Sequence, residues 1–505
     1  MAMTRRIRCI APLLILATIL PSPASAQRGG RVRAAGSTDG GANGLGALHF
    51  RFLGPEGNRV ASITGVPGDP YTVYIGAADG GIWKTTDNGI NWAPIFDDKD
   101  VTAIGALAVA PSEHNTVWAG TGEPWLIRPY YTLGDGVYKS TDAGRTWTHM
   151  GLDETGHIGR IIVDPTNANS VYVCAIGQAF KPQKERGVFH TTDGGSSWKQ
   201  VLAVNDSTGC SDLAMDSKDP QTLIAGMWQL DIHRYDLHSG GLGSGVYITH
   251  DGGATWSRIS GHGLPEASHP LGKIAVAIAP NNSNRYYAMV QDAPAPGLYR
   301  SNDRGVTWQL VNQSHLPDER SPYYTRMTIS PDDENLMYFP SVTFTMSRDG
   351  GTNVFAAGGG GGGGAGGGRG RGGGRGEGGG PENPPTTIAS PGGDNHDVWI
   401  DPTNSNRVLV ANDAGVAISD NRARTYKHHM LTISQVYHVM ADNAIPYNVM
   451  GNIQDKSSFH GSARGSGGGR GGGLPLSNWQ NTGGCEDAFA VPDPTDPNIV
   501  WSGCD

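Results

Sequence analysis

The stretch Ser140-Thr141-Asp142-Ala143-Gly144-Arg145-Thr146-Trp147 contains a short pattern, Ser/Thr-x-Asp-x-Gly-x-Thr/Ser-Trp, that recurs along the chain. Further clear copies begin at Thr85, Thr191, Thr249 and Ser301. Two worn copies follow: one begins at Ser347 and lacks the tryptophan, and one begins at Ser419 and has Asn421 in place of the aspartate. Most copies are about 50 residues apart, which is the period of a repeated four-stranded unit.

Each copy lies between two strand-like runs, such as residues 136–139 and 146–149. An aspartate with a glycine two positions later is turn chemistry, because the carboxylate can accept backbone N–H bonds from residues ahead of it and glycine takes a positive φ without steric cost. The tryptophan offers a large apolar face to a neighbouring unit. We therefore interpret these aspartates as residues that brace a turn, not as catalytic groups.

Between the copies, short strands of alternating polarity are bounded by Pro/Asn turns, with no convincing helix. The pattern predicts an all-β protein: a β-propeller of about seven four-stranded blades over residues 49–432. Residues 433–505 lack the repeated string. We expect there one blade without the string and the first strands of a second, truncated propeller. Two Gly/Arg-rich tracts, 358–380 and 461–473, are expected to be disordered insertions.

Residues 1–26 resemble a secretory signal, with Arg5, Arg6 and Arg8 ahead of an apolar run and an Ala-Ser-Ala site, and residues 27–48 form a Gly-rich leader. The expected location is therefore periplasmic or extracellular. The apolar run is too short to span a membrane. The formal net charge of −9 argues against nucleic acid as a partner.

Four cysteines remain beyond the expected signal: Cys174, Cys210, Cys485 and Cys504. A Cys485–Cys504 bridge fits the open end of a predicted strand pair, and a Cys174–Cys210 bridge would join adjacent blades. Free buried thiols are the alternative for both pairs. No Cys/His spacing resembles a zinc site, and we expect no cofactor.

The long loops opposite the repeated strings carry the chemistry-bearing side chains, which is where function is usually placed on a rigid scaffold. One loop holds Glu123, Trp125, Arg128, Tyr130 and Tyr131, and another holds Trp228. The beginnings of the inner strands should point polar groups at the central channel: Arg160, Asp212, Lys273, Arg326, His396 and Asp397.

The densest cluster is expected where the ring closes. There Asp79 of the first blade should meet Asp413 of the seventh, with Gln454 and Asp455 next to them. Two carboxylates separated by a water-sized gap suit inverting glycoside hydrolysis. Such pairs also bind Ca²⁺ or cap turns, and sequence spacing does not separate these roles.

The repeated string resembles the Asp-box, or BNR, repeat of sialidase-type and sortilin-type propellers. Together with Val163-Asp164-Pro165-Thr166-Asn167 and residues 120–125, Gly-Thr-Gly-Glu-Pro-Trp, it is similar to exported bacterial proteins described as glycosyl-hydrolase-like or sortilin N-terminal-like, which are about twice as long. A more distant resemblance is to the glycoside hydrolase family 74 xyloglucanases. That likeness implies that the early catalytic aspartate falls on Asp79 and that the second belongs to a second propeller; Asp413 lies in a similar turn.

Two functions follow as hypotheses. The first is a polysaccharide hydrolase with Asp79, Asp413, Asp397 and His396 as catalytic residues. Its expected substrate-binding residues are Glu123, Trp125, Arg160, Trp228, Arg326, Gln454 and Asp455, with no metal. The second is a non-catalytic, sortilin-like propeller that binds a peptide, glycan or protein partner.

Overall fold

The computed structural model describes residues 59–126, 132–233, 235–292, 297–358, 388–463, 479–486, 488–496 and 498–504. The expected signal and leader, most of both Gly/Arg tracts, and Arg128, Tyr130 and Tyr131 lie outside these ranges. The described part is almost entirely β-structure, and its only helices are two 3-10 turns, η2 (Asp153–Thr155) and η3 (Leu316–Asp318). The all-β prediction is confirmed.

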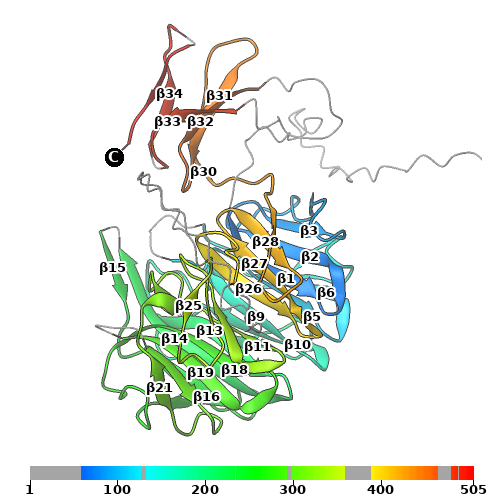
Figure 1. Cartoon of the computed structure of the whole chain (residues 1–505), viewed down its shortest axis with the longest axis vertical. Helices are drawn as coiled ribbons and strands as arrows, with labels where there is room; N and C mark the ends of the chain where they lie inside the picture. Colours follow the sequence, from blue (N-terminus) through cyan, green and yellow to red (C-terminus); the bar gives the residue numbers. More distant parts are fainter. Residues whose placement is uncertain are drawn as a thin grey trace, which may run out of the picture. The chain divides into compact units, whose positions relative to one another are not determined.

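Seven antiparallel sheets follow one another in the order of the chain, each as a meander (Figure 1). The first contains β1 (Val60–Val66), β2 (Asp69–Ala77), β3 (Ile82–Thr85) and β4 (Ala93–Pro94), and the second β5 (Ile104–Ala110), β6 (Glu113–Thr121), β7 (Val137–Ser140) and β8 (Thr148–His149). The third contains β9 (Ile158–Asp164), β10 (Asn167–Ala175), β11 (Gly187–Thr191) and β12 (Lys199–Leu202).

The fourth sheet contains β13 (Thr208–Asp216), β14 (Asp219–His233), β16 (Gly245–Thr249) and β17 (Ser257–Ile259), with β15 (Asp236–Ser239) paired to the far end of β14. The fifth contains β18 (Leu271–Ala279), β19 (Asn282–Asp292), β20 (Gly297–Ser301) and β21 (Gln309–Asn312). The sixth contains β22 (Thr328–Ser330), β23 (Asp333–Phe339), β24 (Thr345–Ser347) and β25 (Phe355–Ala356), and the seventh β26 (Asn395–Asp401), β27 (Asn404–Asn412), β28 (Gly415–Ser419) and β29 (Lys427–His429).

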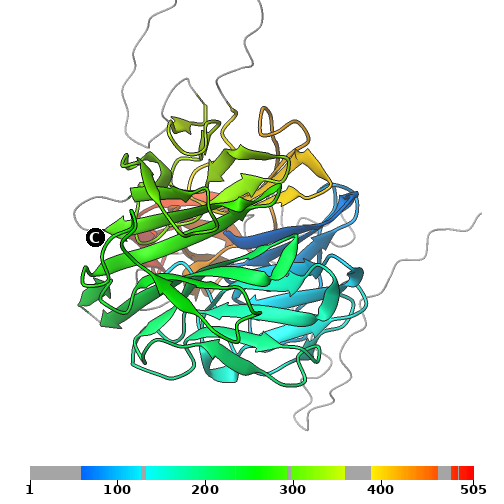
Figure 2. The same ribbon diagram turned by 90° about the horizontal axis from the view of Figure 1, so that it is seen from below.

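The first strands of these sheets pack against one another in sequence, and the succession closes because β26 contacts β1. Figure 2 shows the same succession by colour, from blue through cyan and green to yellow. The core is divided among the interfaces between sheets. One such cluster joins Ile63 and Ile75 of the first sheet to Leu409 and Ile418 of the seventh. The fold is therefore a β-propeller, in which radial packing of small sheets buries both faces of each one.

The repeated string braces a turn in every copy. In all seven, the backbone N–H four residues after the acidic position donates to that side chain, at 2.8 Å for Asn91 to Asp87 and 2.9 Å for Thr146 to Asp142. Asn421 accepts the same bond in the seventh copy. Hydrogen bonds from the hydroxyls of Ser197 and Thr255, together with these backbone bonds, lower the pKa of Asp193 and of Asp251 to about 2. The interpretation of the string as a turn brace is borne out by these bonds.

Beyond the seventh sheet lie a four-stranded sheet, β30 (Val436–Ala441), β31 (Asn448–Ile453), β32 (Ser458–Ser462) and β33 (Trp479–Gly483), and a two-stranded sheet, β34 (Ala490–Pro492) with β35 (Val500–Ser502). Strands were expected close to these positions. That they open a second propeller remains a prediction.

Both cysteine pairs are bridged, Cys174 to Cys210 and Cys485 to Cys504. The first bridge joins β10 to β13 and so ties the third sheet to the fourth. Of the two alternatives left open by the sequence, the structure has the disulfides and not free thiols.

Candidate functional site

The polar residues at the beginnings of the inner strands come from different sheets and meet in the middle of the propeller. Because neighbouring first strands pack together, a side chain near the start of one strand lies beside its equivalent on the next. The side chains involved are buried or largely so. They form two ion-pair networks, one where the ring closes and one farther along it.

The first network is centred on Arg59, which directly precedes β1 and has no exposed surface. Its Nη2 lies 2.6 Å from Glu123 Oε1, and its Nε lies 3.4 Å from Asp413 Oδ1. His396 Nε2 lies 2.6 Å from the same Asp413 oxygen. One arginine thus holds carboxylates from the loop after β6 and from the turn between β27 and β28, and the seventh sheet supplies a histidine.

Burial raises the pKa of the Glu123 carboxyl to about 7, against the opposing effect of Arg59, and both Asp413 and Asp79 raise it further. Burial also raises the pKa of Asp413, while Arg59 lowers it. Burial and the charge of Arg59 hold the pKa of His396 well below its usual range. The imidazole is therefore neutral at pH 7, and a single proton joins it to Asp413.

Asp413 also shares a hydrogen bond with Asp455, and partial burial together with this carboxyl neighbour raises the pKa of Asp455. The backbone N–H of Asp455 donates to Glu486 Oε2 at 2.6 Å. Two carboxyl groups that share a hydrogen bond hold one proton between them, because both cannot be ionised at that distance without repulsion. Asp413 is thus in contact with groups that can supply or accept a proton on two sides.

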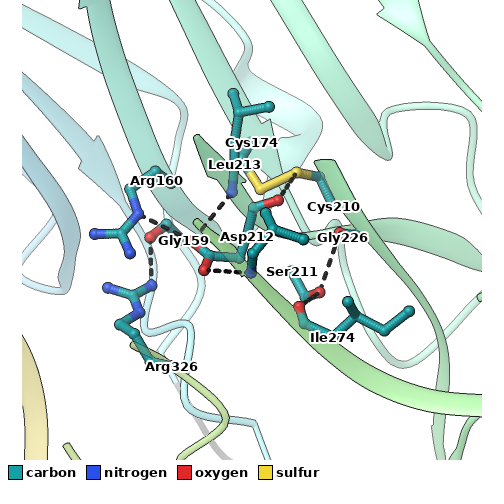
Figure 3. Close-up of a disulfide and its surroundings, with 11 residues drawn as sticks. Gly159, Arg160, Cys174, Cys210, Ser211, Asp212, Leu213, Gly226, Ile274 and Arg326 are labelled. Atoms are coloured by element: carbon teal, nitrogen blue, oxygen red, sulfur yellow. Dashed lines mark hydrogen bonds and ion pairs between the residues drawn. A yellow bond between two sulfur atoms is a disulfide. The ribbon is translucent and has the colours of Figure 1, made fainter. Parts of the chain in front are cut away.

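The second network contains Arg160, Arg326, Asp212 and Asp397. Arg160 Nε lies 3.0 Å from Asp212 Oδ1, and Arg326 Nη1 donates to Asp397 Oδ1 at 3.0 Å. Asp397 also lies 3.5 Å from Arg160 Nη1 and accepts the N–H of Ile63. Figure 3 shows the two guanidinium groups near each other, with Arg160 on Asp212 and Arg326 on the carbonyl of Gly159. Two carboxylates compensate two arginines across four sheets.

Aromatic rings separate the two networks. Arg326 lies 4.7 Å from the ring centroid of Trp125, and the His396 ring lies 5.4 Å from it on a tilted plane. Lys273 Nζ lies 5.0 Å from Trp125 and 5.1 Å from Trp228, and it donates to the carbonyl of Tyr323 at 2.9 Å. Burial and Arg326 lower the pKa of Lys273 to about 7.

Both indoles, which are expected to bind substrate, are buried in the structure. Trp125 is 1% exposed and Trp228 0% exposed, so neither presents an open face on which a sugar could stack. Their faces are already covered by cationic and aromatic neighbours. The predicted contact with a ligand would require those side chains to move.

The other predicted residues lie nearby. Asp79 accepts hydrogen bonds from the hydroxyls of Thr102 and Thr132. Gln454 accepts the hydroxyl of Tyr437 at 2.8 Å, and its backbone N–H donates to the carbonyl of Gln435. Gln435 in turn accepts a bond from Arg59 at 3.2 Å. Gln435 therefore connects Gln454 to Arg59.

Sequence reasoning missed Arg59, Tyr323, Tyr324 and Gln435. Arg59 carries the signal that could have identified it, because it stands at the start of an inner strand like Arg160 and Arg326. Tyr324 donates to Asp394 at 2.6 Å, and Tyr323 accepts a bond from Arg59. These tyrosines come from the loop before β22, where no repeated pattern predicts which side chains turn inward. Among the described residues, no group of three or more His, Cys, Asp or Glu is arranged to hold a metal ion.

Three comparisons relate the sequence and the fold to known proteins. Residues 135–259 match a family model described as Sortilin-Vps10, sortilin, neurotensin receptor 3. A probable oligoxyloglucan-reducing end-specific xyloglucanase of Neosartorya fischeri is 24% identical over 314 residues, which cover 54% of this chain and 37% of that protein. A xyloglucanase of Acetivibrio thermocellus is 28% identical over 334 residues, covering 55% of this chain and 35% of the relative.

The chain thus spans about a third of the length of these curated relatives. A solved ancestral GH74 enzyme is 14% identical with a TM-score of 0.44, and it covers 86% of this chain and 57% of its own. That structural similarity is too low to support a conclusion about function. The chain is a β-propeller protein that resembles the glycoside hydrolase family 74 xyloglucanases. In the described part of the chain, no helix is long and apolar enough to cross a membrane.

Proposed function

We propose that this propeller belongs to an exported glycoside hydrolase that acts on a polysaccharide, with Asp79 and Asp413 as the reacting carboxyl groups. The observation that carries the proposal is that Glu123 is linked to both aspartates: Arg59 pairs with Glu123 and Asp413, and Thr132, whose hydroxyl donates to Asp79, accepts the N–H of Glu123. Acidic groups from the first, second and seventh sheets therefore meet at one place. The curated relatives are xyloglucanases, which supports a polysaccharide as the substrate class.

Hydrolysis with inversion needs one carboxyl group that donates a proton and one carboxylate that activates water. Asp413 suits the donor, because its pKa is raised, its side chain is 12% exposed, and Asp455 and His396 contact it. Asp79 suits the base, since it is partly exposed and two hydroxyl donors orient it. Glu123 and Arg59 would act as positioning residues, because neither is exposed to solvent.

The test is release of reducing sugar from xyloglucan and a panel of other glycans by the full natural polypeptide. Asp79→Asn and Asp413→Asn should each lower kcat by about 10² to 10⁴ fold, the usual contribution of acid or base catalysis. Asp236→Asn is the matched control, because Asp236 pairs with His238 on an exposed hairpin. Thermal unfolding of each variant establishes that it is folded.

A folded wild-type protein that releases no sugar from any glycan would contradict the proposal, as would full activity of both aspartate variants. One observation favours the alternative of a binding propeller. Trp125, Trp228 and Glu123 are buried, so none of these three side chains is open to a saccharide chain for cleavage. Binding of a glycan or peptide to the wild type without hydrolysis, measured by calorimetry and weakened by Asp413→Asn, would establish that function instead.

A further inference from the structure

A groove on the outer rim, away from the ion-pair networks, is lined by β16 and β17 of the fourth sheet and by the turn of the fifth sheet's repeated string. Its volume is about 400 Å³, within the range of small-molecule sites. Arg258 and Arg304 line it with His250, His262, Ser257 and Ser260, and no carboxylate side chain is among its described lining residues. In a chain of net charge −9 this is a local concentration of hydrogen-bond donors.

The repeat shows what the fold requires at position 258. In the second sheet His149 Nε2 bonds the carbonyl of Asp135 at 2.7 Å, and in the third Gln200 donates to the carbonyl of Arg186 at 2.7 Å. In the fourth Arg258 Nη2 donates to the carbonyl of Ser244 at 2.8 Å. The separation is 14 residues each time, and each of the three residues lies opposite an aromatic residue of the third strand.

The neutral amide of Gln200 is therefore sufficient to make this bond in the third sheet. Arg258 brings a positive charge and further N–H groups that the equivalent residues lack. Its Nε is buried and so is not open to a ligand, but its Nη1 has no hydrogen-bond partner, and no carboxylate lies within ion-pair distance of the guanidinium, among the described residues. Arg304 differs, since it lies 3.0 Å from Asp219. Arg258 is thus the cation that the fold leaves to a ligand.

The rest of the groove indicates the shape of that ligand. Ile248, Ile259 and Val306 line the groove together with the hydroxyl and imidazole groups, and such a mixture suits the C–H faces and hydroxyl edges of a sugar ring. The loop that follows β17 also lines a second hollow of about 560 Å³, whose lining includes Leu264, Pro265, Glu266, His269 and Tyr299. Because Glu266 is a carboxylate, the place for an acidic group is the first groove, beside Arg258.

We propose that this rim groove binds an acidic saccharide, with Arg258 pairing to a uronate carboxylate. A guanidinium matches a carboxylate through two parallel N–H bonds, which gives both charge and geometry. The inference does not depend on the proposed hydrolase activity, because the groove shares no residue with the carboxylate site. It assigns to the outer rim a role in holding an acidic glycan.

The test is calorimetric titration of the whole chain with trigalacturonate. Arg258→Gln should keep the bond to the Ser244 carbonyl, as Gln200 does in the third sheet, and should weaken binding about 10- to 100-fold. Arg258→Lys keeps the charge but loses the planar guanidinium, so its affinity should lie between those of the wild type and of Arg258→Gln. The matched control is Arg422→Gln: Arg422 occupies the same position of its string as Arg304, pairs with Asp332, and lies outside the groove.

Cellotriose, a triglutamate peptide and inorganic phosphate distinguish the ligand class. Binding of trigalacturonate alone, lost in Arg258→Gln and kept in Arg422→Gln, is the expected result. Equal binding by the Arg258→Gln variant, or no binding by the wild type, would overturn the proposal. Arg258-dependent binding of the peptide or of phosphate as tight as that of trigalacturonate would overturn the assignment to a saccharide.

Discussion

Arg59 Nη2 and Glu123 Oε1 are 2.6 Å apart, and neither side chain has any surface exposed to solvent. Arg59 precedes the first strand of the first sheet, whereas Glu123 follows the second strand of the second sheet. The pair therefore fixes two sheets relative to each other at the point where the ring closes. The stability of the propeller therefore depends on Arg59 and Glu123, the two residues proposed to position the reacting carboxyl groups.

Arg59→Met should destabilise the fold by about 3–5 kcal/mol, because it leaves Glu123 and Asp413 without their shared cation. Arg59→Lys keeps the charge and should recover part of that loss. Urea unfolding at pH 7 measures both variants. If Arg59→Met unfolds at the wild-type urea concentration, the arginine is not what holds these carboxylates.

Glu123 should make the protein less stable as the pH rises. Its pKa in the fold is about 7, above the ordinary glutamate pKa of 4.5, so the folded state binds a proton more tightly than the unfolded chain does. The associated stability is present below about pH 4.5 and is lost as the pH rises through about 7. Unfolding midpoints at pH 5 and pH 8 should differ less in Glu123→Gln than in the wild type. Identical pH profiles would contradict this assignment.

The aspartates of the repeated string should affect stability in the opposite direction, since they should make the protein more stable as the pH rises. Asp193 and Asp251 have pKa values of about 2, below their value in an unfolded chain, so their contribution is present above about pH 4 and is lost as the pH falls towards 2. Asp251→Asn should keep the turn, as Asn421 does naturally, and should reduce the dependence of the unfolding temperature on acid. Asp251→Ala should lower that temperature at every pH, because the N–H of Thr255 loses its acceptor. An alanine variant as stable as the wild type would count against the brace.

The Cys174–Cys210 bridge should contribute about 3–4 kcal/mol, because it closes a loop of 36 residues in the unfolded chain. Replacing both cysteines by serine should lower the urea midpoint accordingly. Tris(2-carboxyethyl)phosphine should destabilise the wild type more than the double variant, which keeps only the Cys485–Cys504 bridge. An equal effect of the reductant on both proteins would show that the Cys174–Cys210 bridge does not supply this stability.

The fold could be predicted because its signal is local and repeated. Asp87, Asp142 and their equivalents each determine a turn within eight residues, so the positions of the strands follow directly from the copies. Inner strands such as β5 and β9 begin where the apolar alternation begins. None of this requires knowing which residues meet across the ring.

The site was predictable only in part. Asp413 and His396 both belong to the blade that was expected to close the ring, and they lie 2.6 Å apart. Arg59, which binds both Glu123 and Asp413, was missed because its partners are far away in the chain. The burial of Trp125 was also not visible in the sequence, since it depends on cations supplied by β18 and by the residues before β22.

The contact of β26 with β1 also constrains how the chain acquires its structure. The backbone N–H of Ile63 donates to Asp397, 334 residues farther along. Until the seventh sheet has formed, β1 and β2 have an apolar flank without a neighbour, and contacts of such long sequence separation form slowly. A nascent chain that ends before β26 would expose the apolar surface that Leu409 and Ile418 later cover, and that surface is a site for aggregation. Formation of the seventh sheet is thus the step that removes this apolar surface from solvent, and a chain that has not reached it is prone to aggregate.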